Sequence, residues 1–173
     1  MSIDVEIERL QKHHDRDQFD CGEPALNHYL QKIARQAAEK HISTTYVACP
    51  SDHPHQVIGY CTIANFSVQA APQHPKYKNY HHPLPAVLLG RLGVTQDWKG
   101  KHIGEYLLIH AIGQTVVVAQ TIGVIGLYVD PKYPGVIPFY EKYGFAKAVP
   151  DDPNNMQMWL HVDSCSQVVA ALS

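Results

Sequence analysis

Two short stretches contain residue types that could bind and protonate a charged group. The first, Trp98–Gly104, lies between a predicted strand and a predicted helix and contains Gly100. At such a junction free backbone N–H groups and the helix dipole attract an anion such as a phosphate, and glycine permits close approach. Glycine-containing turns of this kind also occur without a phosphate ligand, so the spacing alone leaves a plain turn open.

The second stretch, Pro138–Phe145, is rich in aromatic residues, and its Gly144 is typical of a helix C-terminus. Tyr140 lies near its middle. A phenol with an ordinary pKa near ~10 keeps its proton at neutral pH and can donate it to a strong base formed beside it. The alternative for Tyr140 is a plain packing role, which we expect for Phe139 and Phe145.

The histidines and cysteines do not predict a metal site. The chain has 12 histidines, but none shows the His-Glu-x-x-His spacing that puts two ligands on one helix face. Neighbours such as His13 and His14 are expected to point apart, as solvated surface residues. The cysteines lack a Cys-x-x-Cys pair, so we expect most of the four to be reduced thiols in the core or at the surface. These are Cys21, Cys49, Cys61 and Cys165.

Alternating helical and extended patterns predict an α/β fold around these stretches. The turn Phe19–Gly22 leads into a helix that has Pro24 in its first turn. The residues expected on its buried face are Leu26, Tyr29, Leu30, Ile33 and Ala37. Thr44–Ala48 and Val57–Ile63 then predict a hairpin of two strands.

The second half of the chain predicts strand, helix, strand, short helix and strand. The predicted segments are Ala86–Val94, a helix from Ile103, Val124–Val129, Pro134–Tyr143 and Met156–Leu160. The proline-rich segment Ala70–Pro85 predicts a long loop, either on the acceptor side of a site or a plain surface excursion. The tail Ser164–Ser173 leaves an edge strand, a helix and a dimer contact open.

The order of these motifs resembles the GNAT superfamily of acetyltransferases. In that family a strand, a pyrophosphate loop, a helix, a strand and a Phe-Tyr helix follow one another. The resemblance covers nearly the whole chain. It implies one domain over residues 1–173, with a GNAT fold in which helices flank a mixed central sheet and a splayed strand pair holds acetyl-CoA.

The resemblance also implies roles for individual residues. Tyr140 would protonate the departing thiolate, and a strand N–H near Val94 would polarise the thioester carbonyl. Residues implied in acetyl-CoA binding are Leu92, Gly93, Val94, Lys99, Gly100, Lys101, His102, Ile103, Gly104 and Phe139. The family has a Gln or Arg and a small residue where this chain has Lys99 and His102. The imidazole of His102 could donate to a phosphate or narrow the loop.

Three stretches narrow the resemblance to GNAT toxins of toxin–antitoxin pairs: Phe19–Leu30, Leu89–Val94, and Pro138–Phe145 with Asp152 and Met156 beyond it. Members of that group acetylate the α-amino group of aminoacyl-tRNA, and a ribbon-helix-helix antitoxin neutralises them. The resemblance implies the same acceptor and partner here, with a homodimer. We expect Arg91 to contact the substrate, because an arginine without a partner is costly in an apolar strand.

The overall charge keeps two alternatives open. With 14 Lys and Arg against 16 Asp and Glu, the net charge is −2, which gives no general attraction for RNA. A GNAT enzyme acting on a small-molecule amine or a peptide N-terminus fits this charge. A non-catalytic CoA-binding module is kept open by Lys99 and His102. The acidic start Met1–Glu8 and the lack of a long apolar run predict a cytoplasmic protein without a membrane segment.

Overall fold

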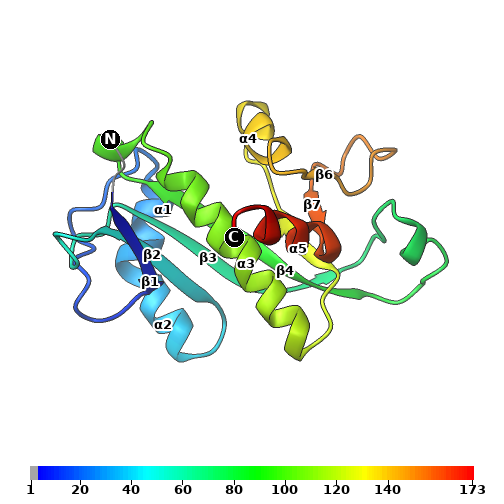
Figure 1. Ribbon diagram of the computed structural model, residues 1–173, viewed down its shortest axis with the longest axis horizontal. Helices are drawn as coiled ribbons and strands as arrows, with labels where there is room; N and C mark the ends of the chain where they lie inside the picture. Colours follow the sequence, from blue (N-terminus) through cyan, green and yellow to red (C-terminus); the bar gives the residue numbers. More distant parts are fainter. Residues whose placement is uncertain (1–3) are drawn as a thin grey trace. The chain divides into compact units, whose positions relative to one another are not determined.

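The computed structural model describes residues 4–173 and confirms the predicted mixed α/β fold (Figure 1). Met1–Ile3, the start of the acidic N-terminus, lie outside the described residues. Within residues 4–173, seven strands are hydrogen-bonded in the order β1-β2-β3-β4-β5-β7-β6. Two compact units share these strands. One runs to Ala64 and includes Gly90–Ala111, and the other comprises Asn65–Leu89 and Ile112–Ser173.

The first unit is built on an antiparallel hairpin. β2 (Thr44–Pro50) pairs with β3 (Gly59–Val68), and this confirms the hairpin predicted from the sequence. β1 (Val5–Arg9) pairs with the other edge of β2 and was not predicted. All residues of β2 after Thr44 are buried, and the helical segment packs on this hairpin.

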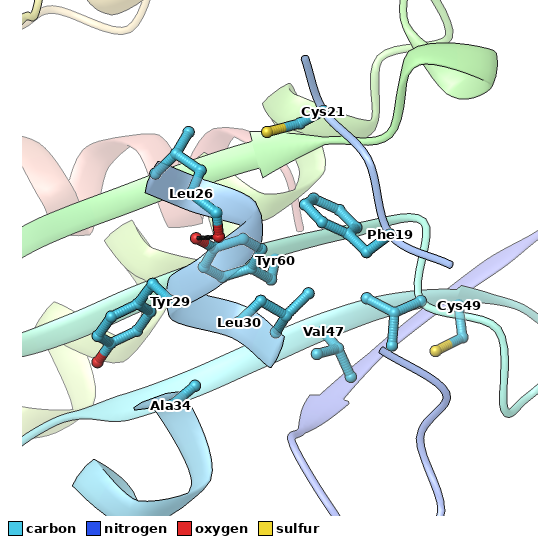
Figure 2. Close-up of a cluster of buried hydrophobic side chains, with 10 residues drawn as sticks. Phe19, Cys21, Leu26, Tyr29, Leu30, Ala34, Val47, Cys49 and Tyr60 are labelled. Carbon is cyan, nitrogen blue, oxygen red and sulfur yellow. Dashed lines mark hydrogen bonds between the residues drawn. The ribbon is translucent and has the colours of Figure 1, made fainter. Parts of the chain in front are cut away.

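One continuous helical segment covers this hairpin. It begins as α1 (Pro24–His28), widens into a π-helical turn (Tyr29–Ile33) and ends as α2 (Ala34–Glu39). Pro24 occupies the first turn, as predicted. Figure 2 shows side chains of this segment facing those of the strands. Among the residues labelled there, those of the helical segment are Leu26, Tyr29, Leu30 and Ala34, and those of the strands are Val47, Cys49 and Tyr60.

The π-helical turn corrects one predicted core residue. Ile33, expected on the buried face, is 41% exposed, while the next residue, Ala34, is fully buried. The N–H of Ala34 bonds to the carbonyl of Tyr29, five residues back, where an α-helix would bond four residues back. The wider turn contains one more residue, so the buried face moves from Ile33 to Ala34.

The second unit contains a parallel strand pair. β4 (Leu84–Val94) pairs with β5 (Gly126–Val129) in a register that joins Val87–Leu89 to Leu127–Val129. β4 itself continues beyond this register to Val94. The predicted helix between the two strands is α3 (Ile103–Thr121), which starts in the first unit and ends in the second.

The rest of the second unit follows β5. A single 3-10 turn leads into α4 (Ile137–Glu141). β7 (Met158–His161) pairs antiparallel with β5, and β6 (Ala146–Lys147) pairs antiparallel with β7 at the edge of the sheet. β7 begins at Met158 and not at the predicted Met156. Of the alternatives for the tail, the structure shows a helix, α5 (Val162–Ala171). Among residues 4–173, no helix combines the length and apolarity needed to cross a membrane.

Candidate active site

The loop between β4 and α3 has the backbone shape of an anion-binding turn. Gly100 has a φ of +80° and His102 a φ of +65°, so two left-handed residues precede the start of α3 at Ile103. The first N–H groups of a helix lack partners within the helix, and the helix dipole adds positive potential there. The predicted loop residues therefore lie where a pyrophosphate group could be held.

His102 adopts a conformation that glycine adopts more easily. A left-handed residue with a Cβ costs roughly 1–2 kcal/mol, which gives a physical reason for a small residue at this place. The ring does not lie free over the loop, because its Nδ1 is 3.4 Å from Oε1 of Glu105 in the first turn of α3. A phosphate contact by His102 would have to compete with this contact to Glu105.

The two lysines of the loop point to protein groups. The ammonium of Lys99 donates a hydrogen bond to the carbonyl of Cys21 at 2.7 Å. The ammonium of Lys101 lies 4.7 Å from the centre of the Trp98 ring, in cation–π geometry. Lys99 thus has a structural partner in this state, and its predicted acetyl-CoA contact stays a prediction.

The turn Phe19–Gly22 holds the start of this loop, a role that sequence reasoning missed. Both the hydroxyl of Thr95 and the N–H of Gln96 donate to the carbonyl of Asp20, at 3.1 and 2.9 Å. Gly22 has a φ of +89°, and a Cβ there would lie 2.7 Å from Nε2 of the Gln96 side chain. The two segments, far apart in sequence, therefore form one hydrogen-bonded unit.

The carboxylate of Asp20 stabilises the turn through hydrogen bonds. It accepts hydrogen bonds from the N–H of Gly22 at 2.9 Å and from the side-chain amide of Asn27 at 3.0 Å. The bond from Gly22, followed by that from Asn27, lowers the pKa of the Asp20 carboxyl. An aspartate and an asparagine flanking a glycine turn were the signal in the sequence that could have indicated this role.

Strand β4 carries the residues predicted to bind the pantetheine arm. Leu92 and Val94 are half-buried, whereas Gly93 is buried. A Cβ on Gly93 would meet the side chains of Phe19 and Cys21 at 3.5 Å, so this side of the strand packs on the Phe19–Gly22 turn. The turn thus supports both the strand and the loop of the predicted cofactor site.

Arg91 is exposed on β4 and has a partner that the sequence did not indicate. Its guanidinium carbon lies 3.7 Å from the centre of the Tyr29 ring. Tyr29 is buried at 6% exposure, begins the π-helical turn, and its hydroxyl is 2.9 Å from Oγ of Ser43. The stacking holds a permanent positive charge in a fixed place at the surface of the first unit.

Tyr140 lies in α4 of the second unit, between two other aromatic rings. The ring centres of Phe139 and Phe145 are 5.2 and 5.6 Å from that of Tyr140, in edge-to-face packing. Gly144 ends this segment with a φ of +95°, as its predicted C-cap role requires. Burial, with a smaller effect from Tyr133, raises the pKa of Tyr140 to about 12.

Comparison with known proteins decides the family. The family model for acetyltransferases of the GNAT family matches residues 7–145. The chain belongs to the GNAT acetyltransferase family. It is 30% identical over 151 residues to a tRNA-acetylating toxin of Mycobacterium tuberculosis (strain ATCC 25618 / H37Rv), and this match covers 87% of this chain and 89% of the toxin.

Solved structures show the same similarity. The chain superposes on AtaT complexed with acetyl-methionyl-tRNAfMet with a TM-score of 0.85 and 27% identity, over 96% of this chain and 99% of that one. A KacT variant in which a tyrosine is replaced by phenylalanine gives a TM-score of 0.86 and 25% identity, over 95% and 99% of the two chains. AtaTR bound with acetyl-CoA gives a TM-score of 0.81 and 28% identity, covering 96% and 98%.

The histidines of this GNAT protein differ from the sequence expectation. His14 is buried and lies beside His13, with ring centres 4.0 Å apart, so this pair does not point apart into solvent. Together with Glu8, the two histidines bring their potential ligand atoms within 4.8 Å of one another. The expectation was wrong because it considered neighbours in the chain and not the strand β1 that carries Glu8.

The hydrogen bonds of His14 are those of a structural tether and not of a metal ligand. Its Nδ1 accepts from the N–H of Gln11 at 2.8 Å, so its Nε2 carries the hydrogen and donates to Glu8 at 2.6 Å. A metal-binding histidine needs the lone pair of one nitrogen and usually donates from the other. Burial lowers the pKa of His14, which favours this neutral form.

The four cysteines are free and buried, in agreement with the prediction of reduced thiols. Burial raises the pKa of Cys49, Cys61 and Cys165 to about 12. These thiols therefore remain protonated at neutral pH, and because the thiolate is the reactive form, they are poor nucleophiles.

Proposed function

We propose that this GNAT protein transfers the acetyl group of acetyl-CoA to the α-amino group of an aminoacyl-tRNA and thereby blocks translation. The observation that carries the proposal is the similarity, over nearly the full length of both chains, to a tRNA-acetylating toxin. The similarity to AtaT complexed with acetyl-methionyl-tRNAfMet supports the same acceptor class.

In the proposed reaction the neutral amine attacks the thioester carbonyl carbon. A C–N bond forms, the C–S bond breaks, and the ammonium proton passes to water. We assign the pyrophosphate to the loop from Lys99 to Gly104 and the pantetheine arm to the backbone groups of Leu92 and Val94. A strand N–H near Val94 would stabilise the oxyanion, where a fixed donor acts most strongly in surroundings that exclude water.

Tyr140 is assigned as the acid that protonates the sulfur. Its raised pKa, about 12, keeps the phenol protonated over the whole working pH range. An apolar environment also makes a thiolate more basic, so burial shifts the proton donor and the acceptor in the same direction. The aromatic packing of Phe139 and Phe145 fixes the ring, which limits the positions that the hydroxyl can take.

The proposed acceptor requires little help from a protein base. An α-amino group has an ordinary pKa near ~8, against ~10.4 for a lysine side chain, so a useful fraction is neutral at pH 7. Arg91 is assigned to an acceptor phosphate, since its charge is exposed and held by Tyr29. Arginine pairs with phosphate through two parallel hydrogen bonds when its plane is fixed.

The proposal includes the partners and setting of the protein. We expect the two compact units to act as one acetyltransferase domain, in a homodimer, in the cytoplasm, and neutralised by a ribbon-helix-helix antitoxin. A structure of an AtaT variant bound to the C-terminus of its antitoxin AtaR, at 26% identity and a TM-score of 0.79, supports a protein antitoxin for this chain as well.

An acetylation assay tests the proposal. Pure protein and radiolabelled acetyl-CoA are incubated with charged tRNA, with the same tRNA after deacylation, and with a panel of free amines and peptides. Label on charged tRNA alone is expected. Label only on free amines or peptides would assign the protein to the small-amine alternative. No transfer to any acceptor, with acetyl-CoA still bound, would favour the non-catalytic module.

A further inference from the structure

Negatively charged residues are absent from one interval of this slightly acidic chain. No Asp or Glu occurs between Asp52 and Asp97, although the net charge of the whole chain is −2. The same interval contains Lys76, Lys78 and Arg91. The interval contains strands β3 and β4, and between them lies the 69–83 loop, which leads into β4 and is drawn in green in Figure 1. This loop carries the two lysines.

The base of the 69–83 loop is fixed to the second unit. The ring of His74 stacks on that of His161 at the end of β7, with centres 4.4 Å apart and planes at 16°. The hydroxyl of Tyr77 is 2.8 Å from Nε2 of His161. Since Nδ1 of His161 accepts from the N–H of Asp163, Nε2 carries the hydrogen and Tyr77 accepts it. The N–H of Gln73 also bonds to the carbonyl of Ala148 at 2.8 Å.

Lys76 belongs to this base, because its charge is already paired. Its ammonium lies 3.2 Å from the carboxylate of Asp163, next to the His161 tether. The part of the loop beyond Tyr77 remains exposed, from Lys78 to His82. We call these five residues the loop tip.

The loop tip combines a cation with an exposed aromatic ring. Tyr80 is 48% exposed, its N–H bonds to the carbonyl of Tyr77 at 3.1 Å, and its ring lies edge-on to that of His82 at 5.7 Å. Lys78 is exposed beside it, and no acidic residue occurs in the loop to neutralise it. Aromatic rings that stack on bases, next to lysines that meet phosphates, are the common means of binding single-stranded or unpaired nucleic acid.

We propose that the loop tip is a contact surface for the RNA acceptor, with Lys78 at a phosphate and Tyr80 stacked on an unpaired base. The proposal rests on the proposed function, in that the RNA is a tRNA. RNA fits better than a lipid surface, because the tip has a single lysine and no apolar side chain of the aliphatic kind that inserts into a bilayer. The fixed base reduces the entropy that a free loop would lose on binding.

The test measures binding of deacylated tRNA, which requires no acetyl transfer. For Tyr80→Ala we expect the Kd to rise about tenfold, as for the loss of one base–aromatic stack, whereas Tyr80→Phe, which keeps the ring, should bind like the wild type. For Lys78→Ala we expect weaker binding and a salt dependence reduced by about one counterion. Acetyl-CoA affinity and thermal melting should be unchanged in all three.

Unchanged tRNA affinity in Tyr80→Ala and Lys78→Ala would overturn the proposal. The same holds if these variants bind tRNA normally and lose only the binding of a protein partner. Photo-crosslinking of wild-type protein to tRNA gives a check that needs no variant, and crosslinks confined to peptides outside residues 69–83 would contradict the proposal. If charged tRNA is not acetylated but the tip binds RNA, the proposed function fails alone. If charged tRNA is acetylated with no effect of the tip, the tip proposal fails alone.

Discussion

Tyr140 combines two properties that a proton donor to a leaving thiolate needs. Its pKa is raised to about 12 by burial, and its ring is packed between Phe139 and Phe145. The first property keeps the proton on the phenol until a stronger base forms, and the second limits where the hydroxyl can point. The pKa shift rests mainly on burial, with a smaller electrostatic effect from Tyr133.

Replacement of Tyr140 by Phe should therefore remove the acid and keep the packing. We expect kcat for acetyl transfer to fall about a hundredfold or more, as for the loss of a general acid, with an unchanged Kd for acetyl-CoA. Steady-state kinetics and calorimetry measure the two quantities. Tyr143→Phe, another phenol of the same segment, serves as the control and should retain activity. A Tyr140→Phe enzyme with wild-type kcat would remove Tyr140 from the mechanism.

His102 is a second residue whose conformation makes a prediction. Its φ of +65° strains a residue with a Cβ, so His102→Gly should raise the free energy of unfolding by up to about 1 kcal/mol. Gly100→Ala is the matched opposite change. A Cβ at Gly100 meets no atom within 4 Å, so its cost of about 1 kcal/mol would come from φ alone. Urea unfolding of both variants measures these changes, and a destabilised His102→Gly would show that the contact with Glu105 outweighs the strain.

Among the elements, the predicted pyrophosphate loop depends on a turn from a distant part of the chain. Asp20 accepts hydrogen bonds through its carboxylate within the turn and through its carbonyl from Thr95 and Gln96. Loss of the carboxylate should loosen the turn and, through it, the start of the loop. The backbone geometry that would hold a pyrophosphate is therefore set in part by a residue that need not touch the ligand.

Asp20→Ala should accordingly weaken acetyl-CoA binding severalfold, because the ligand would have to order a loop that the wild type holds in place. Asp17→Ala removes the same charge from an exposed position nearby, and we expect it to bind acetyl-CoA normally. Calorimetric titration with acetyl-CoA compares the two. Equal affinities for both variants would mean that the loop keeps its shape without the Asp20 carboxylate.

The tethers at β1 and β7 depend on neutral histidines. Burial lowers the pKa of both His14 and His161 from the ordinary value of 6.5. Below pH 6.5 the unfolded chain then binds more protons at these positions than the folded protein, so the free energy of unfolding should fall as the pH decreases through this range. Above it, these groups contribute no pH dependence.

Urea unfolding at pH 7.5 and at pH values below 6.5 measures this dependence. A glutamine side chain can donate and accept hydrogen bonds as a neutral imidazole does, but it does not titrate. In His161→Gln the free energy of unfolding should therefore fall less, as the pH decreases below 6.5, than it does in the wild type. His81→Gln, at the exposed loop tip, is the control and should keep it. A wild-type protein that becomes more stable below pH 6.5 would show that Glu8 and Asp163, which favour the charged forms, outweigh burial.

At the scale of the whole molecule, the sequence predicted the elements whose signals are local. The hairpin β2–β3, strand β4 and helix α3 each have an apolar spacing that can be recognised within one segment. Gly100 and Gly144 likewise indicated their turns, since both adopt positive φ. The family resemblance joined these elements into the fold that the structure and the comparisons confirm.

What the sequence could not predict depends on contacts between distant segments. The π-helical turn at Tyr29 fits the helix to its packing partners, and strand β1 exists only beside β2. The burial of His14 depends on Glu8, and the partner of Lys99 is the carbonyl of Cys21. In each case the residue type was visible but its partner was not.

The central claim is that the acetyl group ends on the α-amine of an amino acid esterified to tRNA. Charged tRNA treated with acetyl-CoA and the protein can be digested to its 3′-terminal aminoacyl-adenosine, and mass spectrometry then locates the added acetyl group. We expect an N-acetyl-aminoacyl adenosine that is absent with the Tyr140→Phe variant. An unmodified aminoacyl-adenosine, with the acetyl group recovered only on free amines or peptides, would contradict it.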